Sequence, residues 1–320
     1  MRFTRLVAIA LAFAVLAACS DSERPSATAS SASSASTTAA ATAATDCNRP
    51  HASGQSTETF DFAGQTRTYE LYVPAAYTGA RAVPAVFNFH GFGSNAMQQM
   101  VYGNFKPLAD RDDFLIIAPD GQTDNRHFNL GNETGLQNDV EMTLALLDHI
   151  ETTFCIDAKR VYSTGMSDGG AMTSVLACRA SDRFAAFGAV AVVLFLPGCG
   201  GSTPIAITAF MGTDDPVVPF DGGTVQCCGG AQVSGAPEAT AGWAEHDGCA
   251  PAFSDERLGS EVRRRTWSGC QSGGEVVFYI IDGGGHTWPG SLPIASLGLT
   301  TKQIDASATI WDFFQAHPLA

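Results

Sequence analysis

Hydrophobic positions along the chain follow two alternating periods, and this pattern predicts a β-sheet wrapped by helices. Short, solidly apolar runs, typical of strands buried on both faces, recur along the chain. Segments whose apolar residues are three or four positions apart separate them, as in amphipathic helices. The predicted strands are residues 83–89, 114–118, 161–164, 187–193, 205–211, 262–267 and 276–281, of which 83–89, 187–193 and 205–211 are predicted to be buried. The predicted helices are residues 94–109 (capped by Ser94), 139–154, 169–178, 238–246 and 306–314.

A hairpin precedes the first buried strand. Residues 57–62 and 66–73 each alternate apolar with polar side chains, and a turn sequence with a glycine, Ala63-Gly64-Gln65, separates them. Beyond it, strands alternate with helices in units of roughly 30 residues, which favours a mainly parallel sheet flanked by helices. No internal repeat or long linker interrupts this pattern. We therefore predict a single α/β domain over residues 47–320.

The first 46 residues lie outside this pattern. Two arginines precede an apolar run over residues 6–16, which is short for a membrane span. The run ends in Leu16-Ala17-Ala18-Cys19, which resembles the lipobox of bacterial lipoproteins, where the cysteine is lipidated and becomes the new N-terminus. We predict a signal peptide over residues 1–18 and a lipidated Cys19 that opens a Ser/Ala/Thr-rich tether over residues 19–46. The alternative is an ordinary secretory signal and a soluble secreted protein.

Cysteine usage agrees with export. The chain has nine cysteines, and setting Cys19 aside leaves an even number, as expected of disulfides in an exported protein. The chain has no pair of cysteines at the C-x2-C spacing that is typical of zinc sites, so we expect no metal. From their positions along the predicted elements we expect the pairs Cys249–Cys270, Cys178–Cys199 and Cys47–Cys155. The adjacent Cys227 and Cys228 then either bond to each other or pair elsewhere.

Composition and charge exclude several classes of protein. The 320 residues are 45% hydrophobic and only 16% charged, which excludes a disordered chain or a coiled coil. The formal net charge is −14, and the only basic run is residues 263–265. Because a nucleic-acid-binding protein needs a basic stripe to neutralise phosphates, we expect no nucleic-acid partner. We expect no cofactor either, and contact with a membrane only through Cys19.

A candidate nucleophile follows the predicted strand 161–164. Gly165-Met166-Ser167-Asp168-Gly169 is a G-x-S-x-G sequence between a strand and a helix, the context of a nucleophile elbow. The flanking glycines allow the sharp turn that exposes the serine hydroxyl. The helix N-terminus behind it supplies a backbone N–H, that of Asp168, for an oxyanion. The sequence therefore predicts a catalytic Ser167.

A catalytic serine needs a base and an acid that orients it, and in the elbow fold both come after the serine. The histidines after Ser167 are His246, His286 and His317. Of these, His286 lies in a glycine-rich loop directly after a strand, whereas His246 is on a predicted surface helix and His317 is near the end of the chain. The candidate acids after strand 205–211 are Asp214 and Asp215, between which the residues alone do not decide, and Asp282 is a weaker rival.

The loop after strand 83–89 reads His90-Gly91-Phe92-Gly93-Ser94. A loop of this kind supplies the second oxyanion donor in the elbow fold, which we assign to the N–H of Phe92. His90 and Trp288 are candidate residues of the substrate pocket. The alternatives are a structural hydrogen-bonding role, favoured for His90, and a core position for Trp288.

Together these motifs make the chain similar to the α/β-hydrolase family of exported polyhydroxybutyrate depolymerase-like and feruloyl esterase-like enzymes. The matching stretches begin at His90-Gly91-x-Gly93-Ser94-Asn95 and Ala118-Pro119-Asp120-Gly121, continue through the Ser167 elbow and Gly212-Thr213-x-Asp215-Pro216, and end with Gly285-His286-Thr287-Trp288-Pro289-Gly290. The Gly-Thr-x-Asp pattern implies Asp215 rather than Asp214 as the acid. The chain departs from the family pattern at Asp168, where asparagine or phenylalanine is frequent, and at Met211, where histidine is frequent.

The resemblance implies a serine esterase that uses Ser167, His286 and Asp215 to hydrolyse polyhydroxybutyrate-type oligomers or feruloyl and acetyl esters of plant polysaccharides. Two alternatives stay open from the sequence. One is a serine peptidase of the same fold, and the other is a non-catalytic, membrane-anchored binding lipoprotein.

Overall fold

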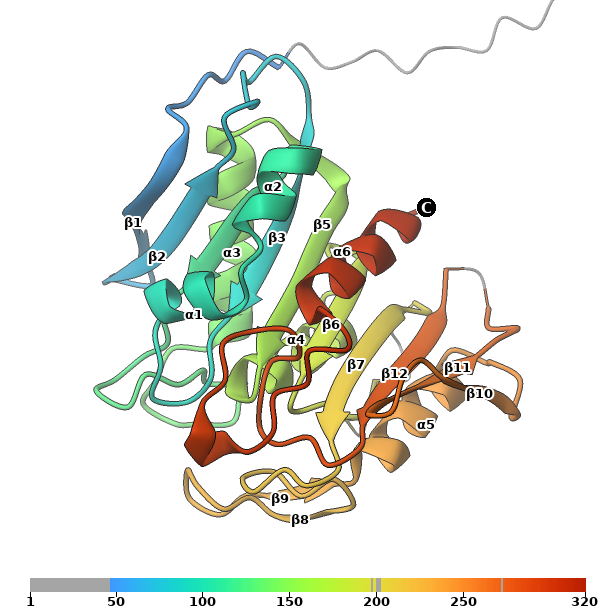
Figure 1. Ribbon diagram of the computed structural model, residues 1–320. Coiled ribbons are helices and arrows are strands. Elements are labelled where there is room, and N and C mark those ends of the chain that lie inside the picture. The colour runs from blue at the N-terminus through green and yellow to red at the C-terminus, as the bar shows by residue number, and fades with distance from the viewer. Residues whose placement is uncertain (1–46, 197, 200–202, 272) are drawn as a thin grey trace, which may run out of the picture. The chain divides into compact units, whose positions relative to one another are not determined.

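A mixed sheet of ten strands forms the centre of the part of the chain that the structure describes (Figure 1). The computed structural model describes residues 47–196, 198–199, 203–271 and 273–320. The strand order is β1-β2-β4-β3-β5-β6-β7-β12-β11-β10, and the six strands from β4 to β12 in this order run parallel. The strands of this sheet are β1 (Gly54–Phe62), β2 (Gln65–Val73), β3 (Val83–Phe89), β4 (Leu115–Pro119), β5 (Ile156–Met166), β6 (Ala186–Val190), β7 (Ala206–Gly212), β10 (Phe253–Arg257), β11 (Val262–Trp267) and β12 (Glu275–Ile281). The predicted α/β fold with a mainly parallel sheet is therefore confirmed, whereas the predicted signal peptide 1–18, the tether 19–46 and Cys19 lie outside the described residues.

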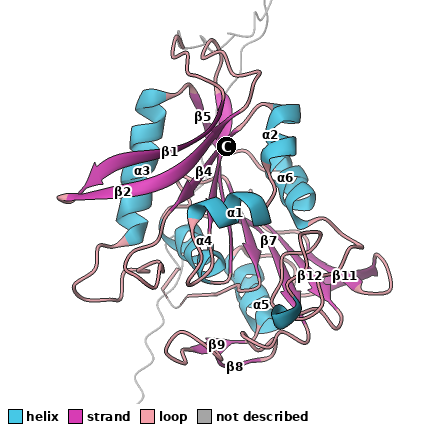
Figure 2. Cartoon of the chain, turned by 60° about the vertical axis from the view of Figure 1, so that its left-hand side comes forward, coloured by secondary structure: helices cyan, strands magenta, loops and turns pink. Residues whose placement is uncertain are grey.

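Helices cover both faces of the sheet, and Figure 2 shows α3 and α4 on one side of the strands and α2 and α6 on the other. The helices are α1 (Ala96–Tyr102), α2 (Lys106–Asp112), α3 (Asp139–Thr153), α4 (Asp168–Arg179), α5 (Ala236–His246) and α6 (Ala306–Ala316). Their apolar sides and the two faces of the sheet form two separate clusters of buried side chains. Because both faces are covered, the central strands β3, β4, β6 and β7 are buried along their whole length. No helix in the described ranges is long and apolar enough to cross a bilayer.

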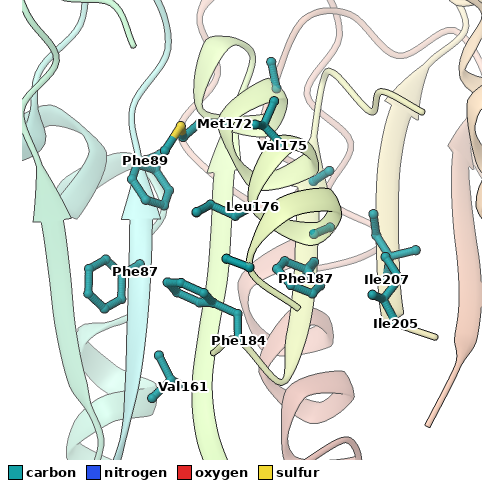
Figure 3. Close-up of a cluster of buried hydrophobic side chains, with 14 of the residues drawn as sticks. Phe87, Phe89, Val161, Met172, Val175, Leu176, Phe184, Phe187, Ile205 and Ile207 are labelled. Carbon is teal, nitrogen blue, oxygen red and sulfur yellow. The ribbon is translucent and has the colours of Figure 1, made fainter. Parts of the chain in front are cut away.

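The packing beneath α4 holds that helix firmly against the sheet. Figure 3 shows Phe87 and Phe89 of β3 beside Met172 and Leu176 of α4. Phe87 also meets Phe184 edge to face, with 5.5 Å between ring centroids. All five side chains are fully buried or nearly so, and each contributes roughly 1.5–3 kcal/mol to folding. This packing fixes the N-terminus of α4, where Ser167 lies.

The helix predicted over residues 94–109 is instead two helices. Asn95, not Ser94, is the cap of α1, and its side chain accepts a hydrogen bond from the N–H of Gln98 at 2.8 Å. Gly103 ends α1 and lies so close to Asn88 that an added Cβ would be 2.8 Å from Nδ2 of that side chain. The next residue has a positive φ, and a proline in the first turn of α2 restarts the helix. The prediction was wrong here because apolar spacing alone does not reveal a change of direction.

Three short strands were not predicted. β8 (Gly222–Thr224) pairs with β9 (Gln232–Ser234) in a small separate hairpin, and β10 adds an edge to the main sheet. β10 is exposed along its whole length, and its polar residues pair with the basic run of β11, as Asp255 does with Arg265 at 2.8 Å. Neither apolar alternation nor a buried run identifies such strands, because hydrogen bonds and charge pairs hold them rather than burial.

Four disulfides connect the described residues. The structure pairs Cys47–Cys155, Cys178–Cys199 and Cys249–Cys270, the three pairs expected from the sequence. Cys227 and Cys228 bond to each other, one of the two possibilities that the sequence left open.

Candidate active site

The parallel strands bring four separated motifs to one edge of the sheet (Figure 1). Gly91 and Phe92 follow β3, Ser167 follows β5, Asp215 follows β7 and His286 follows β12. The carboxyl ends of neighbouring parallel strands meet at the same edge, which is where open α/β sheets bind their ligands. The topology, rather than any local sequence feature, therefore assembles this site.

Ser167 lies at the sharp turn between β5 and α4, with φ 56° and ψ −116°. This positive φ is unusual for a residue with a side chain, and it is the strained geometry of a nucleophile elbow. The turn needs glycine on both sides. A Cβ at Gly169 would be 2.1 Å from the carbonyl oxygen of Phe89, and one at Gly165 would be 2.5 Å from the carbonyl carbon of Gly169. The hydrogen bond from the Ser167 N–H to the carbonyl of Val190, at 2.8 Å, holds the turn against β6.

His286 and Asp215 form a buried pair. The Nδ1 of His286 is 2.7 Å from Oδ2 of Asp215, and the two side chains are 6% and 0% exposed. The other oxygen of Asp215, Oδ1, accepts backbone hydrogen bonds from Val217 and Val218, both at 2.8 Å. All these bonds hold the carboxylate in one orientation, so its Oδ2 is aimed at the imidazole.

The rival acids have other partners. Asp214 is exposed, and its backbone N–H bonds to the carbonyl of Gly284 at 2.9 Å. Asp282 pairs with Arg263 and Arg257. The structure thus brings Asp215, and neither Asp214 nor Asp282, to the ring of His286.

The other two histidines after Ser167 also have other partners. The Nδ1 of His246 is 2.7 Å from Oδ1 of Asp247, and this side chain is only 6% exposed rather than on the surface as predicted. His317 pairs with Glu275 at 2.9 Å. Only His286 of these three lines a cavity together with Ser167.

Two cavities open at Ser167. The first has a volume of about 620 Å³ and is lined by Ser167, His286 and a set of apolar side chains. The second has a volume of about 380 Å³ and is lined by Ser167, Asp168 and mainly apolar side chains that include Val192 and Leu194. Their sizes are those of small-molecule sites. The apolar wall of the first cavity was not predicted from the sequence, although Met97 and Val101 are large exposed apolar residues four positions apart on α1.

The loop after β3 approaches the serine closely. A Cβ at Gly91 would be 3.4 Å from Cβ of Ser167, an ordinary van der Waals contact, so Gly91 lies directly beside the serine. Within the described ranges no protein acceptor receives the backbone N–H of Phe92 or that of Asp168. Two N–H groups beside Ser167 are therefore available to an oxygen of a bound substrate.

His90 is fully buried and does not line either cavity, so it is not a pocket residue. Its Nδ1 donates to the carbonyl of Gly91 at 2.7 Å, and its Nε2 accepts from the N–H of Gly121 at 2.9 Å. Burial lowers the pKa of His90, which keeps the ring neutral as this bonding pattern requires. His90 instead positions the loop that carries Phe92.

Trp288 is also wrongly assigned to the pocket from sequence. Its side chain is 1% exposed, its Nε1 donates to Oγ of Ser307 at 2.9 Å, and it meets Phe105 edge to face. It lines neither cavity. Trp288 is a core residue, and its contacts with Ser307 and Phe105 anchor the loop that also carries His286.

Asp168 combines a partly buried carboxyl group with one structural hydrogen bond. Its Oδ2 accepts from the N–H of Phe128 at 2.8 Å. Burial raises the pKa of this carboxyl from 3.8 to about 6, and the Phe128 bond offsets only part of that effect. At neutral pH the folded protein therefore carries a carboxylate that burial disfavours.

We predict that Asp168→Asn raises the melting temperature at pH 8 and changes it little at pH 4. Between pH 4 and pH 6 the folded state binds the Asp168 proton more tightly than the unfolded state, so the free energy of unfolding falls as pH rises through this window. Asparagine removes this cost and can still accept the Phe128 N–H, which gives a gain of about 1–2 kcal/mol above pH 6. Melting curves from pH 4 to pH 8 measure the effect. A variant that is no more stable than the wild type at pH 8 would contradict this prediction.

No group of three or more histidine, cysteine or acidic side chains in the described part of the chain has the arrangement of a metal site. The side chains and backbone of the site itself supply a hydroxyl on a strained turn, a histidine oriented by a carboxylate, and two available N–H groups. These are the parts of a nucleophilic acyl-transfer site.

Comparison with known proteins shows similarity to esterases. A family model described as Esterase PHB depolymerase matches residues 67–227. Probable feruloyl esterase C of Aspergillus niger is 30% identical over 259 residues, which are 78% of this chain and 84% of that protein. Feruloyl esterase B of Piromyces equi is 29% identical over 222 residues, which are 67% of this chain but only 41% of that protein.

Among solved structures, the fold is similar to that of the acetyl xylan esterase from Aspergillus awamori, with a TM-score of 0.58 and 16% sequence identity. The similarity covers 82% of this chain and 99% of that one, and at this identity it concerns the fold alone. It agrees with the predicted α/β-hydrolase fold. The chain belongs to the esterase PHB depolymerase family of carboxylic ester hydrolases.

Proposed function

We propose that the protein hydrolyses carboxylic esters through an acyl-enzyme on Ser167. The observation that carries this proposal is the buried pair of His286 and Asp215, joined at 2.7 Å, in which His286 lines the same cavity as the serine of the elbow. Asp215 holds the Nδ1–H of His286, which leaves Nε2 free to accept the Ser167 proton. A histidine in this tautomer is what a serine nucleophile requires.

In the first half of the reaction, His286 takes the proton of Ser167 as the hydroxyl oxygen attacks the ester carbonyl. The negative charge that develops on the carbonyl oxygen is held by the N–H groups of Phe92 and Asp168. The imidazolium then gives its proton to the leaving alcohol, and the acyl group stays on Ser167. In the second half, water takes the place of the alcohol and loses a proton to His286 as it attacks the acyl carbon. The bond from that carbon to the Ser167 oxygen then breaks, His286 returns the proton to this oxygen, and the carboxylic acid is released.

The proposed substrates are esters with a compact polar or aromatic acyl group, of the feruloyl, acetyl or 3-hydroxybutyryl kind. The names of the matched family and relatives support this class, and the two cavities beside Ser167 offer room on both sides of an ester bond. Nothing in the site favours peptide hydrolysis or binding without turnover.

A substrate panel tests the proposal. The purified protein is assayed with methyl ferulate, acetylated xylan, 3-hydroxybutyrate oligomers, 4-nitrophenyl acetate and a set of unblocked peptides. We expect turnover of 4-nitrophenyl acetate and of at least one of the three natural ester classes, and none of the peptides. Cleavage of peptides without ester hydrolysis would indicate a peptidase, and no turnover at all would indicate a binding protein.

We further propose that the protein is exported and lipidated at Cys19. Support comes from the signal-like first 18 residues, the small-residue sequence before Cys19 and the four disulfides. Mass spectrometry of the mature N-terminus tests this: an acylated cysteine supports the anchor, and an unmodified N-terminus at another residue refutes it.

A further inference from the structure

The two cavities beside Ser167 have only four lining residues in common: Phe92, Ser167, Cys227 and Cys228. Ser167 is the proposed nucleophile, and Phe92 carries a proposed oxyanion donor. The other two are the bonded pair of adjacent cysteines, which the proposed reaction does not use. The disulfide therefore lies where the two cavities meet, as the serine does.

The hairpin that carries this disulfide is tied to the site. Cys227 and Cys228 lie in the turn between β8 and β9, which is closed by hydrogen bonds from Val225 N–H to the carbonyl of Ala231 and from Gly230 N–H to the carbonyl of Cys227, both at 2.9 Å. The N–H of Gln226 donates to the carbonyl of Val217 at 2.8 Å, and Val217 in turn donates to Asp215. The position of the disulfide is thereby fixed relative to the proposed triad.

This bridge differs from the other three. They link residues 21 or 108 positions apart, and cross-links of that span stabilise a fold by restricting the unfolded chain. A bridge between neighbours closes no loop, so it gives almost none of that stabilisation. Both of its cysteines are exposed, whereas each of the other bridges has at least one cysteine that is buried or half-buried. The position of the Cys227–Cys228 disulfide at the two cavities therefore explains its presence better than a contribution to the stability of the fold does.

The residues that line only one of the two cavities indicate which part of the ester each cavity faces. His286 lines only the first cavity and Asp168 only the second. Because His286 must hand its proton to the leaving oxygen, the first cavity faces the alcohol part of the ester. The second cavity, on the side of the oxyanion donor Asp168, then faces the acyl part.

We propose that the Cys227–Cys228 disulfide is a specificity-determining element, the common wall between an alcohol compartment and an acyl compartment. This inference rests on the proposed ester hydrolysis at Ser167. Each compartment uses the apolar, rigid disulfide as its inner wall, so large groups on either side of the ester bond gain contact from it. A small ester that fills neither compartment gains little.

The double variant Cys227→Ala/Cys228→Ala tests the proposal with three esters: ethyl acetate, ethyl hexanoate and hexyl acetate. The last two are isomers with the long chain on opposite sides of the ester bond. We expect the selectivity for each isomer over ethyl acetate, as a ratio of kcat/KM, to fall about tenfold, the order of magnitude of losing one or two methylene-sized contacts. The change should fall on KM rather than on kcat.

The matched control is Cys249→Ala/Cys270→Ala, which removes a bridge that lines neither cavity. It should lower the melting temperature and leave both selectivity ratios within about twofold, because its contribution is to the unfolded chain. Selectivity ratios that stay at the wild-type values in the Cys227→Ala/Cys228→Ala variant would overturn the proposal. The Ser167→Ala variant tests the proposed reaction separately, by loss of all turnover. A wrong role for the disulfide can therefore be distinguished from a wrong reaction.

Two further measurements do not depend on the folding of the double variant. In the first, the wild type is briefly reduced and its free thiols are trapped with iodoacetamide, under conditions in which peptide mapping finds modification only at Cys227 and Cys228. This treatment should lower the same two selectivity ratios. Ile294→Trp, which narrows the first cavity, should shift the preference between the isomers toward ethyl hexanoate, and Ala231→Trp, in the second, toward hexyl acetate. Shifts of the same sign in both tryptophan variants would contradict the assignment of the compartments.

Discussion

Ser167→Ala is expected to lower kcat for 4-nitrophenyl acetate by at least about 10⁴-fold, because it removes the oxygen that we propose forms the acyl-enzyme. The remaining oxyanion donors and cavities would bind the ester without a nucleophile to attack it. The fold should be unaffected, since the Ser167 hydroxyl has no hydrogen-bond partner among the described residues and alanine keeps the same backbone. Steady-state kinetics and a melting curve of the purified variant measure the two effects.

His286→Ala and the double variant Ser167→Ala/His286→Ala are the matched comparisons. Members of a triad act as a unit, so each single variant and the double variant should lose activity to a similar extent rather than multiplicatively. Turnover by Ser167→Ala close to that of the wild type would show that the nucleophile is elsewhere. An unaltered melting temperature distinguishes lost chemistry from lost structure.

Asp215→Asn is expected to lower kcat by about 10⁴-fold, the size of effect seen when a triad acid becomes an amide. In the wild type, Oδ1 of Asp215 is occupied by two backbone N–H groups, and Oδ2 faces Nδ1 of His286. In the variant, the amide oxygen best satisfies the two N–H groups, which turns the NH₂ group toward the ring. The ring must then accept at Nδ1 and carry its proton on Nε2, the tautomer that cannot take the proton of Ser167.

Asp214→Asn is the control for this prediction. Asp214 precedes Asp215 in the chain but is exposed, and its side chain does not contact His286. We expect its kcat to stay within about twofold of the wild-type value, as for most surface substitutions away from a site. A larger loss in Asp214→Asn than in Asp215→Asn would move the acid to Asp214.

Elements with strong local signals were predicted well from the sequence. The strand predicted over residues 83–89 is β3 to the residue, and the hairpin of β1 and β2 lies where the alternation placed it. These segments bury a continuous or alternating set of apolar side chains, so hydrophobicity alone identifies them. The break between α1 and α2 and the exposed strand β10 have no such signal, because a glycine contact with Asn88 and charge pairs with β11 define them.

The residues of the site divide in the same way. Ser167, Asp215 and His286 could be named in advance because each follows a buried strand in a motif with its own local pattern, and parallel strands deliver such loops to one edge. His90 and Trp288 lie beside those motifs and were wrongly taken as pocket residues. Whether a side chain in a loop points into a cavity or into the core depends on what packs against it, here Gly121 for His90 and Ser307 for Trp288.

The sequence by itself determined the order of the buried strands and of the longer helices, the elbow at Ser167 and the chemistry of its partners, because these depend on residues near one another in the chain. Only the tertiary structure decided which apolar side chains line the two cavities, that His90 and Trp288 line neither, and that Cys227–Cys228 lies where the two cavities meet. Those relations join loops as many as 206 residues apart, between Gly91 and Leu297. Contacts over such separations depend on how the strands are ordered in the sheet, and no short stretch of sequence encodes that order.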